Sequence, residues 1–145
     1  MIENYSKIKE YYNSSACAYE FSNGQLMKKE DKEFMQSVTE FINNNLENTE
    51  LKPEDLAEHL QISIRSLYRK FKEMEQLPPK DLIKDCRINL AAKLLKTTTL
   101  TVQEIIYQCG FGNRSHFYKE FDKRFQMTPK EFRQQHKLKD ESLAD

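Results

Sequence analysis

The chain has 145 residues and equal numbers of basic and acidic side chains, 23 of each. This length accommodates one ordinary domain or two very small ones, and the low content of Gly (3) and Pro (4) favours helices over a loop-rich β fold. No apolar run approaches the roughly 20 residues that span a bilayer, and the N-terminus lacks the apolar core of a secretory signal. We therefore expect a cytoplasmic location and no membrane contact by this segment.

The charge is distributed unevenly along the chain. Residues 1–50 carry 5 Lys and Arg against 9 Asp and Glu, a net of −4, whereas residues 51–138 carry 17 against 11, a net of +6. A basic segment beside an acidic one is a weak indication of a part that binds a polyanion.

Residue types that carry chemistry are few and scattered. The three cysteines lack C-x-x-C spacing, so we predict neither a disulfide framework nor a metal site, and burial in the core is the expected fate of Cys86 and Cys109. The three histidines are far apart, and no nucleophile or phosphate-loop motif is present. The sequence therefore predicts no enzyme activity and no cofactor.

The N-terminal part is expected to be a short helix within residues 1–14 and a linker to residue 29, because Asn, Ser and Gly cluster there. From Glu30, apolar residues recur at helical spacing as far as Leu46, which predicts a helix that leads into the basic segment.

Two short helices joined by a tight turn are predicted over residues 53–74. Pro53 suits the first helical position, and Ser63 can cap the second helix by accepting from free backbone N–H groups. The second helix would bury Leu67 and Phe71. Its other face would present Arg65, Tyr68, Arg69 and Lys72, at spacings i, i+3, i+4 and i+7.

A long helix is predicted over residues 79–96, with a buried stripe of Leu, Ile, Ala and Cys. A second helix pair follows over residues 102–125, with Thr101 and Asn113 as caps. A last helix should run from Pro129 to about His136, and we expect residues 139–145 to be disordered.

The second helix pair repeats the first. Tyr118 follows Tyr68 and Phe121 follows Phe71 at a separation of 50 residues. Before Ser63 the separation is 49, because the second turn is one residue longer. With no third copy, this is an internal duplication and not a repeat array.

Two short helices with a tight turn match a helix-turn-helix, whose second helix enters the DNA major groove. Arg can pair bidentately with guanine there, and Ser, Tyr, Lys and helix N-termini suit phosphates. We therefore predict that the chain binds double-stranded DNA through residues of both second helices. The candidates are Ser63, Arg65, Tyr68, Arg69 and Lys72 in the first unit, and Asn113, Arg114, Ser115, His116, Tyr118 and Lys119 in the second.

The long helix between the units has a mechanical role in this interpretation. About 17 residues at 1.5 Å rise make a rod of roughly 25 Å, so with a unit at each end the recognition helices could lie about one DNA turn apart, ~34 Å. The alternative is a helical protein-interaction module whose basic faces bind an acidic partner.

The residues LAEHLQISIRSLYRKFKE and the run from Arg87 to Arg133 closely resemble the AraC/XylS DNA-binding domain over residues 51–136. The most specific matches lie in the second half. They are Gly110-Phe111, Ser115, Phe117, Phe121, Thr128-Pro129 and Arg133. The resemblance implies an all-α domain of seven helices, two helix-turn-helix subdomains joined by a linker helix, that acts as a transcription regulator.

The resemblance also implies roles for single positions. Arg87 matches a linker-helix arginine expected to be structural. Gln76 and Gln126 stand where the family often has Gly, so we expect strained or altered turns at both. Asp122 stands where Lys72 sits in the first unit, so the first unit should contribute more electrostatic binding to DNA.

Residues 19–50 are similar to the lead-in of this domain in hybrid two-component regulators of Bacteroidetes. This similarity implies that the chain is the output part of a longer regulator. An upstream receiver or sensor domain and RNA polymerase are then the expected protein partners.

Overall fold

The computed structural model describes the backbone of residues 28–144 and side chains as far as Lys137. The described range contains seven α-helices and no strand, which confirms the predicted all-α class. The predicted short helix and linker before residue 28 lie outside the described residues. In chain order the helices are α3 (Lys29–Asn44), α4 (Pro53–His59), α5 (Ile64–Glu73), α6 (Pro79–Thr97), α7 (Val102–Gln108), α8 (Arg114–Phe125) and α9 (Pro129–Ala144).

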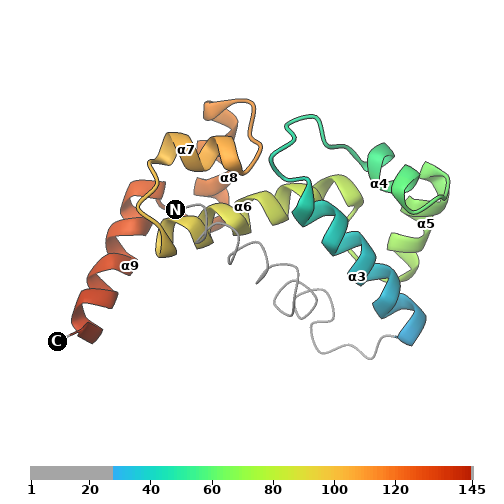
Figure 1. The fold of residues 1–145 in the computed structure, drawn as a ribbon, viewed down its shortest axis with the longest axis horizontal. Helices are drawn as coiled ribbons and strands as arrows, with labels where there is room; N and C mark the ends of the chain where they lie inside the picture. The colour runs from blue at the N-terminus through green and yellow to red at the C-terminus, as the bar shows by residue number, and fades with distance from the viewer. Residues whose placement is uncertain (1–27, 145) are drawn as a thin grey trace.

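Helix α6, the linker helix, runs through the middle of the molecule (Figure 1). Helices α3, α4 and α5 gather at its N-terminal end, where α3 and α5 contact it, and α7, α8 and α9 gather at its C-terminal end, where α7 and α9 contact it. The first helix-turn-helix is α4–α5 and the second is α7–α8. The sequence pattern predicted this order and these bounds to within one or two residues.

Local side-chain caps begin the helices of the second unit. The Thr101 hydroxyl accepts from the N–H of Glu104 at 3.1 Å at the start of α7. At the start of α9 the Thr128 hydroxyl accepts from the N–H of Glu131 at 3.1 Å, and the Glu131 carboxylate accepts from the N–H of Thr128 at 3.4 Å. Thr128 and Glu131 thus form a complete capping box, in which each side chain accepts from the other residue's backbone N–H.

The turns inside the two helix-turn-helix units share one backbone design. Gln61 and Gly110 hold the left-handed conformation, with φ of 59° and 78°. In both turns the next residue donates its N–H to the carbonyl five residues earlier, at 3.0 and 3.1 Å. This bond ends the first helix of each unit and directs the chain into the recognition helix.

The core runs continuously from α3 to α9 along the linker helix. Burial of the linker helix follows the predicted stripe, and Ile88 and Ala92 are buried as well. The side chains with no exposed surface, drawn from both units, are Val38, Ile42, Leu56, Leu67, Ala91, Leu94, Ile105, Cys109, Phe117 and Phe121. The buried side chains of the linker helix belong to the same core as those of both helix-turn-helix units.

The prediction for the end of the chain was wrong. Helix α9 continues through Ala144, whereas the sequence suggested an end near His136 and a disordered tail from residue 139. The stretch KDESLA contains neither Gly nor Pro and is rich in residues compatible with a helix, so nothing local ends α9 at His136.

The turns after the two recognition helices are strained at different positions. Gln126 is left-handed, with φ of 57°, but in the first unit the left-handed residue is Glu75 and not Gln76. Leu77 precedes Pro78, and a residue before proline is disfavoured in the helical region. We attribute the one-residue shift to this restriction, because the turn after α5 must close earlier than the turn after α8.

Candidate nucleic-acid interface

Helix α5 presents a basic face to solvent. The Ser63 hydroxyl accepts from the N–H of Ser66 at 3.0 Å and so caps the helix. Leu67 and Phe71 are buried on the inner side and fix the rotation of α5 about its axis. We call the exposed residues of this unit the first basic surface: Ser63, Arg65, Tyr68, Arg69 and Lys72.

One cation of α5 does not belong to this surface. The Nζ atom of Lys70 lies 3.8 Å from the Asp31 carboxylate and 4.8 Å from the ring centroid of Phe34, both on α3. Lys70 therefore holds α5 against α3, while the other cations of the helix face solvent.

Helix α8 presents the equivalent face in the second unit. The Asn113 side chain caps it by accepting from the N–H of His116 at 3.1 Å. Phe117 and Phe121 have no exposed surface and orient the helix. We call the outward residues the second basic surface: Asn113, Arg114, Ser115, His116 and Lys119, which are exposed, and Tyr118, which is half-buried.

Arg114 and Tyr118 form a pair within the second basic surface. The guanidinium carbon lies 5.3 Å from the tyrosine ring centroid, and Nη2 lies 3.4 Å from the phenolic oxygen. A guanidinium over an aromatic ring is attracted by the ring quadrupole. The pair therefore limits the freedom of the Arg114 side chain before any ligand is present.

The second recognition helix is joined to the linker helix by ion pairs that the sequence did not reveal. Lys84 Nζ lies 3.6 Å from Glu120 Oε2, and His116 Nε2 lies 3.7 Å from the other oxygen of the same carboxylate. Arg124 forms an ion pair with Asp85. The cross-helix partners are 36 and 39 residues apart, so no helical spacing rule could pair them.

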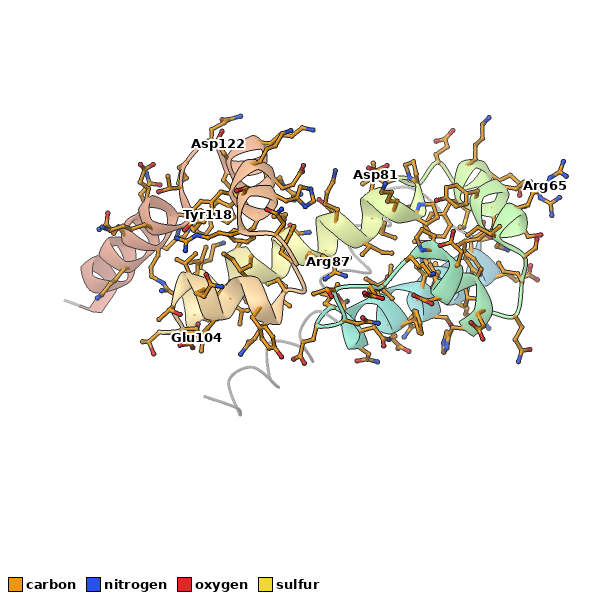
Figure 2. All side chains as sticks on the ribbon, turned by 90° about the horizontal axis from the view of Figure 1, so that it is seen from above. Arg65, Asp81, Arg87, Glu104, Tyr118 and Asp122 are labelled. Carbon is orange, nitrogen blue, oxygen red and sulfur yellow. The ribbon has the colours of Figure 1, made fainter. Side chains whose placement is uncertain are left out.

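The two units carry opposite charges at the equivalent positions Lys72 and Asp122. Lys72 and Asp122 are both exposed and 50 residues apart. Figure 2 shows Asp122 at the outer edge of α8 and Arg65 at the outer end of α5. An acidic side chain on the second recognition helix reduces its positive potential, as the sequence predicted.

Arg87 belongs to neither surface. Its residue is 6% exposed, and its guanidinium donates to three backbone carbonyls, those of Leu46 (2.6 Å), Cys109 (2.7 Å) and Asn48 (2.9 Å). Burial lowers the pKa of Arg87 and raises the pKa of the Cys109 thiol. The expectation that Arg87 is structural is confirmed.

In Figure 2 α5 lies by the N-terminal end of the linker helix, and α8 lies beside its middle, where Glu120 and Arg124 pair with Lys84 and Asp85. Among residues 28–144 no cluster of His, Cys, Asp and Glu could hold a metal ion. Within the same range no helix has the length and apolar character needed to cross a bilayer.

A family model described as a helix-turn-helix domain matches residues 56–135, more than half of the chain. Solved structures with the same fold include an AraC-type DNA-binding protein from Chromobacterium violaceum, at 28% identity and a TM-score of 0.67, covering 75% of this chain and 96% of that one. The chain belongs to the AraC-type helix-turn-helix family. This family is one of DNA-binding transcription regulators and not of enzymes.

Relatives of this AraC-type domain occur in two contexts. A histidine kinase of Formosa agariphila, "Histidine kinase P4", is 28% identical over 102 residues, which cover 70% of this chain and 7% of the kinase. The transcriptional activator RhaS of Salmonella arizonae is 36% identical over 81 residues, which cover 56% of this chain and 29% of the activator. This chain therefore spans less than a third of the length of these relatives.

A response regulator also supplies a similar structure. The C-terminal domain of the two-component response regulator yesN from Fusobacterium nucleatum has 30% identity and a TM-score of 0.62, and the match covers 68% of this chain and 96% of that domain. The similarity includes most of the AraC-type domain of this chain.

Proposed function

We propose that this AraC-type domain reads a bipartite DNA site by inserting α5 and α8 into successive major grooves on one face of the duplex. The observation that carries the proposal is that both recognition helices keep exposed basic faces while packing along one linker helix. A linker helix of 19 residues is about 28 Å long, close to the ~34 Å repeat between successive major grooves.

We assign base contacts to the exposed arginines of the two surfaces. Arg65 and Arg69 lie on the first two turns of α5, and Arg114 begins α8, where recognition helices meet base edges. A guanidinium can donate to O6 and N7 of guanine together. The Arg114–Tyr118 pair would present that guanidinium in a restricted orientation, which lowers the entropy lost on binding.

Phosphate contacts fall to the remaining polar groups of the surfaces. Lys72 and Lys119 are exposed cations, and Ser115 and His116 lie in the first turn of α8 beside its free N–H groups. The side-chain oxygens of Ser63 and Asn113 already accept cap hydrogen bonds. Asn113 would contact phosphate through its side-chain N–H groups. The Ser63 hydroxyl also donates to Ser66 Oγ at 2.9 Å and would exchange that hydrogen bond for one to phosphate.

The two units would contribute unequally to affinity. Asp122 would repel phosphate on the second unit, whereas Lys72 attracts it on the first. Since the surfaces also differ in sequence, the DNA site need not be palindromic. One chain would then bind both half-sites, whereas symmetric regulators use the two subunits of a dimer for this purpose.

We also propose that this chain is the output domain of a signal-responsive regulator. It matches a small part of a histidine kinase and most of the C-terminal domain of a response regulator. An upstream receiver or sensor domain in the same full-length protein would then control access to DNA in the cytoplasm, and RNA polymerase would be the partner at the promoter.

A selection experiment tests the DNA proposal. The 145-residue chain is incubated with a library of random duplexes, and bound DNA is recovered and sequenced over several rounds. We expect a site of two unlike half-sites whose centres are about 10 base pairs apart. Recovery of no enriched sequence, or of a single half-site alone, would contradict the proposal. Double substitution of Arg65 and Arg69 by Ala is the matched control and should abolish enrichment of one half-site only.

A further inference from the structure

We propose that Arg87 fixes the relative position of the two recognition helices and thereby sets the half-site spacing that the chain accepts. The claim about half-site spacing rests on the proposed binding of two half-sites by one chain. The claim that Arg87 fixes the positions of α5 and α8 does not depend on that proposed function. Arg87 is a positioning residue in this account, because it contacts no DNA.

The hydrogen bonds of Arg87 join three parts of the fold at one point. Arg87 lies in the linker helix itself. Leu46 and Asn48 lie in the connection between α3 and α4, before the first helix-turn-helix, and Cys109 ends α7 in the second. One guanidinium therefore fastens both units to the linker helix and to each other.

The junction around Arg87 is closely packed. A Cβ atom built on Gly110 would lie 1.7 Å from Arg87 Nη1 and 1.9 Å from the carbonyl oxygen of Leu46. The turn of the second unit thus approaches the connection of the first unit so closely that only glycine fits. A small rotation of either unit would separate the carbonyls from the guanidinium or bring them into collision.

The chemistry of the site requires arginine in particular. Nη1 donates to two carbonyls and Nη2 to a third, in directions fixed by the planar guanidinium. The ammonium group of lysine is a compact point donor and could not hold the same three carbonyls in that arrangement. The ion pairs identified among residues 28–137 do not include Arg87. The buried charge is thus held by backbone dipoles whose positions define the junction.

A fixed junction has a direct consequence for bipartite binding. When one recognition helix is bound, the second meets its half-site at an effective concentration set by the stiffness of the connection. A stiff connection favours one spacing strongly and penalises its neighbours. Loosening the junction should therefore lower affinity at the preferred spacing and reduce the penalty at other spacings.

The first test measures the protein without DNA. Spin labels are placed on α5 and α8 through Glu73→Cys and Lys123→Cys, both at exposed positions, in a chain carrying Cys17→Ser. The native Cys86 and Cys109 are buried and should not react. We expect a narrow distance distribution by pulsed electron resonance in the wild-type background and a clearly broader one with Arg87→Met. An unchanged distribution in Arg87→Met would overturn the proposal.

Two further variants keep this test decisive. Arg87→Lys retains the charge and should also broaden the distribution; it replaces Arg87→Met if circular dichroism shows that the methionine variant is unfolded. Leu94→Ala lowers stability from a fully buried position elsewhere in the linker helix and should leave the width unchanged. Equal broadening by Leu94→Ala would assign the effect to stability and also overturn the proposal.

The second test uses the selected DNA site with one base pair inserted or removed between its half-sites. We expect the wild-type chain to lose affinity by about tenfold or more for either change, and Arg87→Met to lose less than about threefold. Affinity for an isolated half-site should be the same in both. An equal spacing penalty in both proteins would overturn the proposal. If the wild-type chain selects only one half-site, the bipartite function fails instead, and the spin-label widths alone decide the role of Arg87.

Discussion

Gln61 and Gly110 occupy the same backbone position in the two helix-turn-helix units, 49 residues apart, and both hold a positive φ, 59° and 78°. Gln61 is exposed, so its side chain extends into solvent. Gly110 is buried under the guanidinium of Arg87 and the carbonyl of Leu46. The two turns therefore share one backbone conformation in different surroundings. A side chain fits at the exposed position 61 but not at the buried position 110.

Gly110→Ala should destabilise the chain strongly. The left-handed backbone costs an alanine about 1–2 kcal/mol, and the clash with the Arg87 side chain and the Leu46 carbonyl adds about 1–3 kcal/mol. Urea denaturation followed by circular dichroism measures the sum. The matched variant Gln61→Gly should change the free energy of unfolding by less than about 1 kcal/mol. Equal effects of the two substitutions would show that the Arg87 junction is not closely packed.

Phe121→Ala should cost about 3–5 kcal/mol of unfolding free energy. Phe121 has no exposed surface, and its ring centroid lies 4.7 Å from that of Phe125 and 5.4 Å from that of Phe132. Tyr107→Ala is the control, because Tyr107 is 75% exposed and its loss should change stability by no more than about 0.5 kcal/mol. A melting temperature unmoved by Phe121→Ala would remove this residue from the core.

Arg65→Ala and Arg69→Ala should each weaken binding to the selected site by about 1–3 kcal/mol and relax the sequence preference within one half-site. Mobility shifts on the selected site and on single-base variants measure both effects. Lys137→Ala, an exposed cation on α9, is the control and should leave the preference intact. Loss of affinity that is uniform across all sequences would assign the arginines to phosphates.

Removing a positive charge from α8 and adding one to it should change the salt dependence of DNA binding in opposite directions. Lys119→Ala should reduce the slope of log K against log salt by about 0.9, the value for one lost phosphate contact. Asp122→Lys should raise affinity and steepen the slope by a similar amount. Titrations at several salt concentrations give both slopes. A slope unaffected by Asp122→Lys would place this side of α8 away from the DNA backbone.

The buried thiol of Cys109 should make stability fall at alkaline pH. Burial raises the pKa of Cys109 in the folded chain, whereas a thiol in the unfolded chain ionises near its ordinary value of about 8.5. Above about pH 8.5 the unfolded chain releases the Cys109 proton, whereas the folded chain keeps it. The free energy of unfolding is therefore unaffected by Cys109 below this pH and falls as the pH rises above it. The expected extra slope is at most about 1.4 kcal/mol per pH unit. Urea denaturation of wild type and Cys109→Ala at several pH values gives this slope as the difference between the two proteins. If the unfolding free energies of both proteins change with pH in parallel, the raised pKa of Cys109 is contradicted.

The features that the sequence predicted depend on local interactions. The caps at Ser63, Asn113 and Thr101 need partners only three residues away, and all three are present. The inner and outer faces of the recognition helices follow from helical spacing in the same way. This is why the bounds of the duplicated units and the exposure of their basic residues could be predicted well.

The features that were missed depend on distant parts of the chain. The carbonyl partners of Arg87 and the pairing of Arg124 with Asp85 join residues 22 to 41 positions apart, and no spacing rule connects them. The sequence indicated strained or altered turns at Gln76 and Gln126 but not which residue after α5 takes the left-handed conformation, which is Glu75. The end of α9 was also placed too early, where no local signal stops the helix.

Hydroxyl-radical footprinting of the 145-residue chain on its selected site tests the central claim most directly. Two unequal basic surfaces on one rigid linker helix should protect two patches of backbone, about 10 base pairs apart and on the same face of the duplex. Arg65→Ala combined with Arg69→Ala should erase one patch and leave the other. A single protected patch, or two patches on opposite faces of the DNA, would contradict the account.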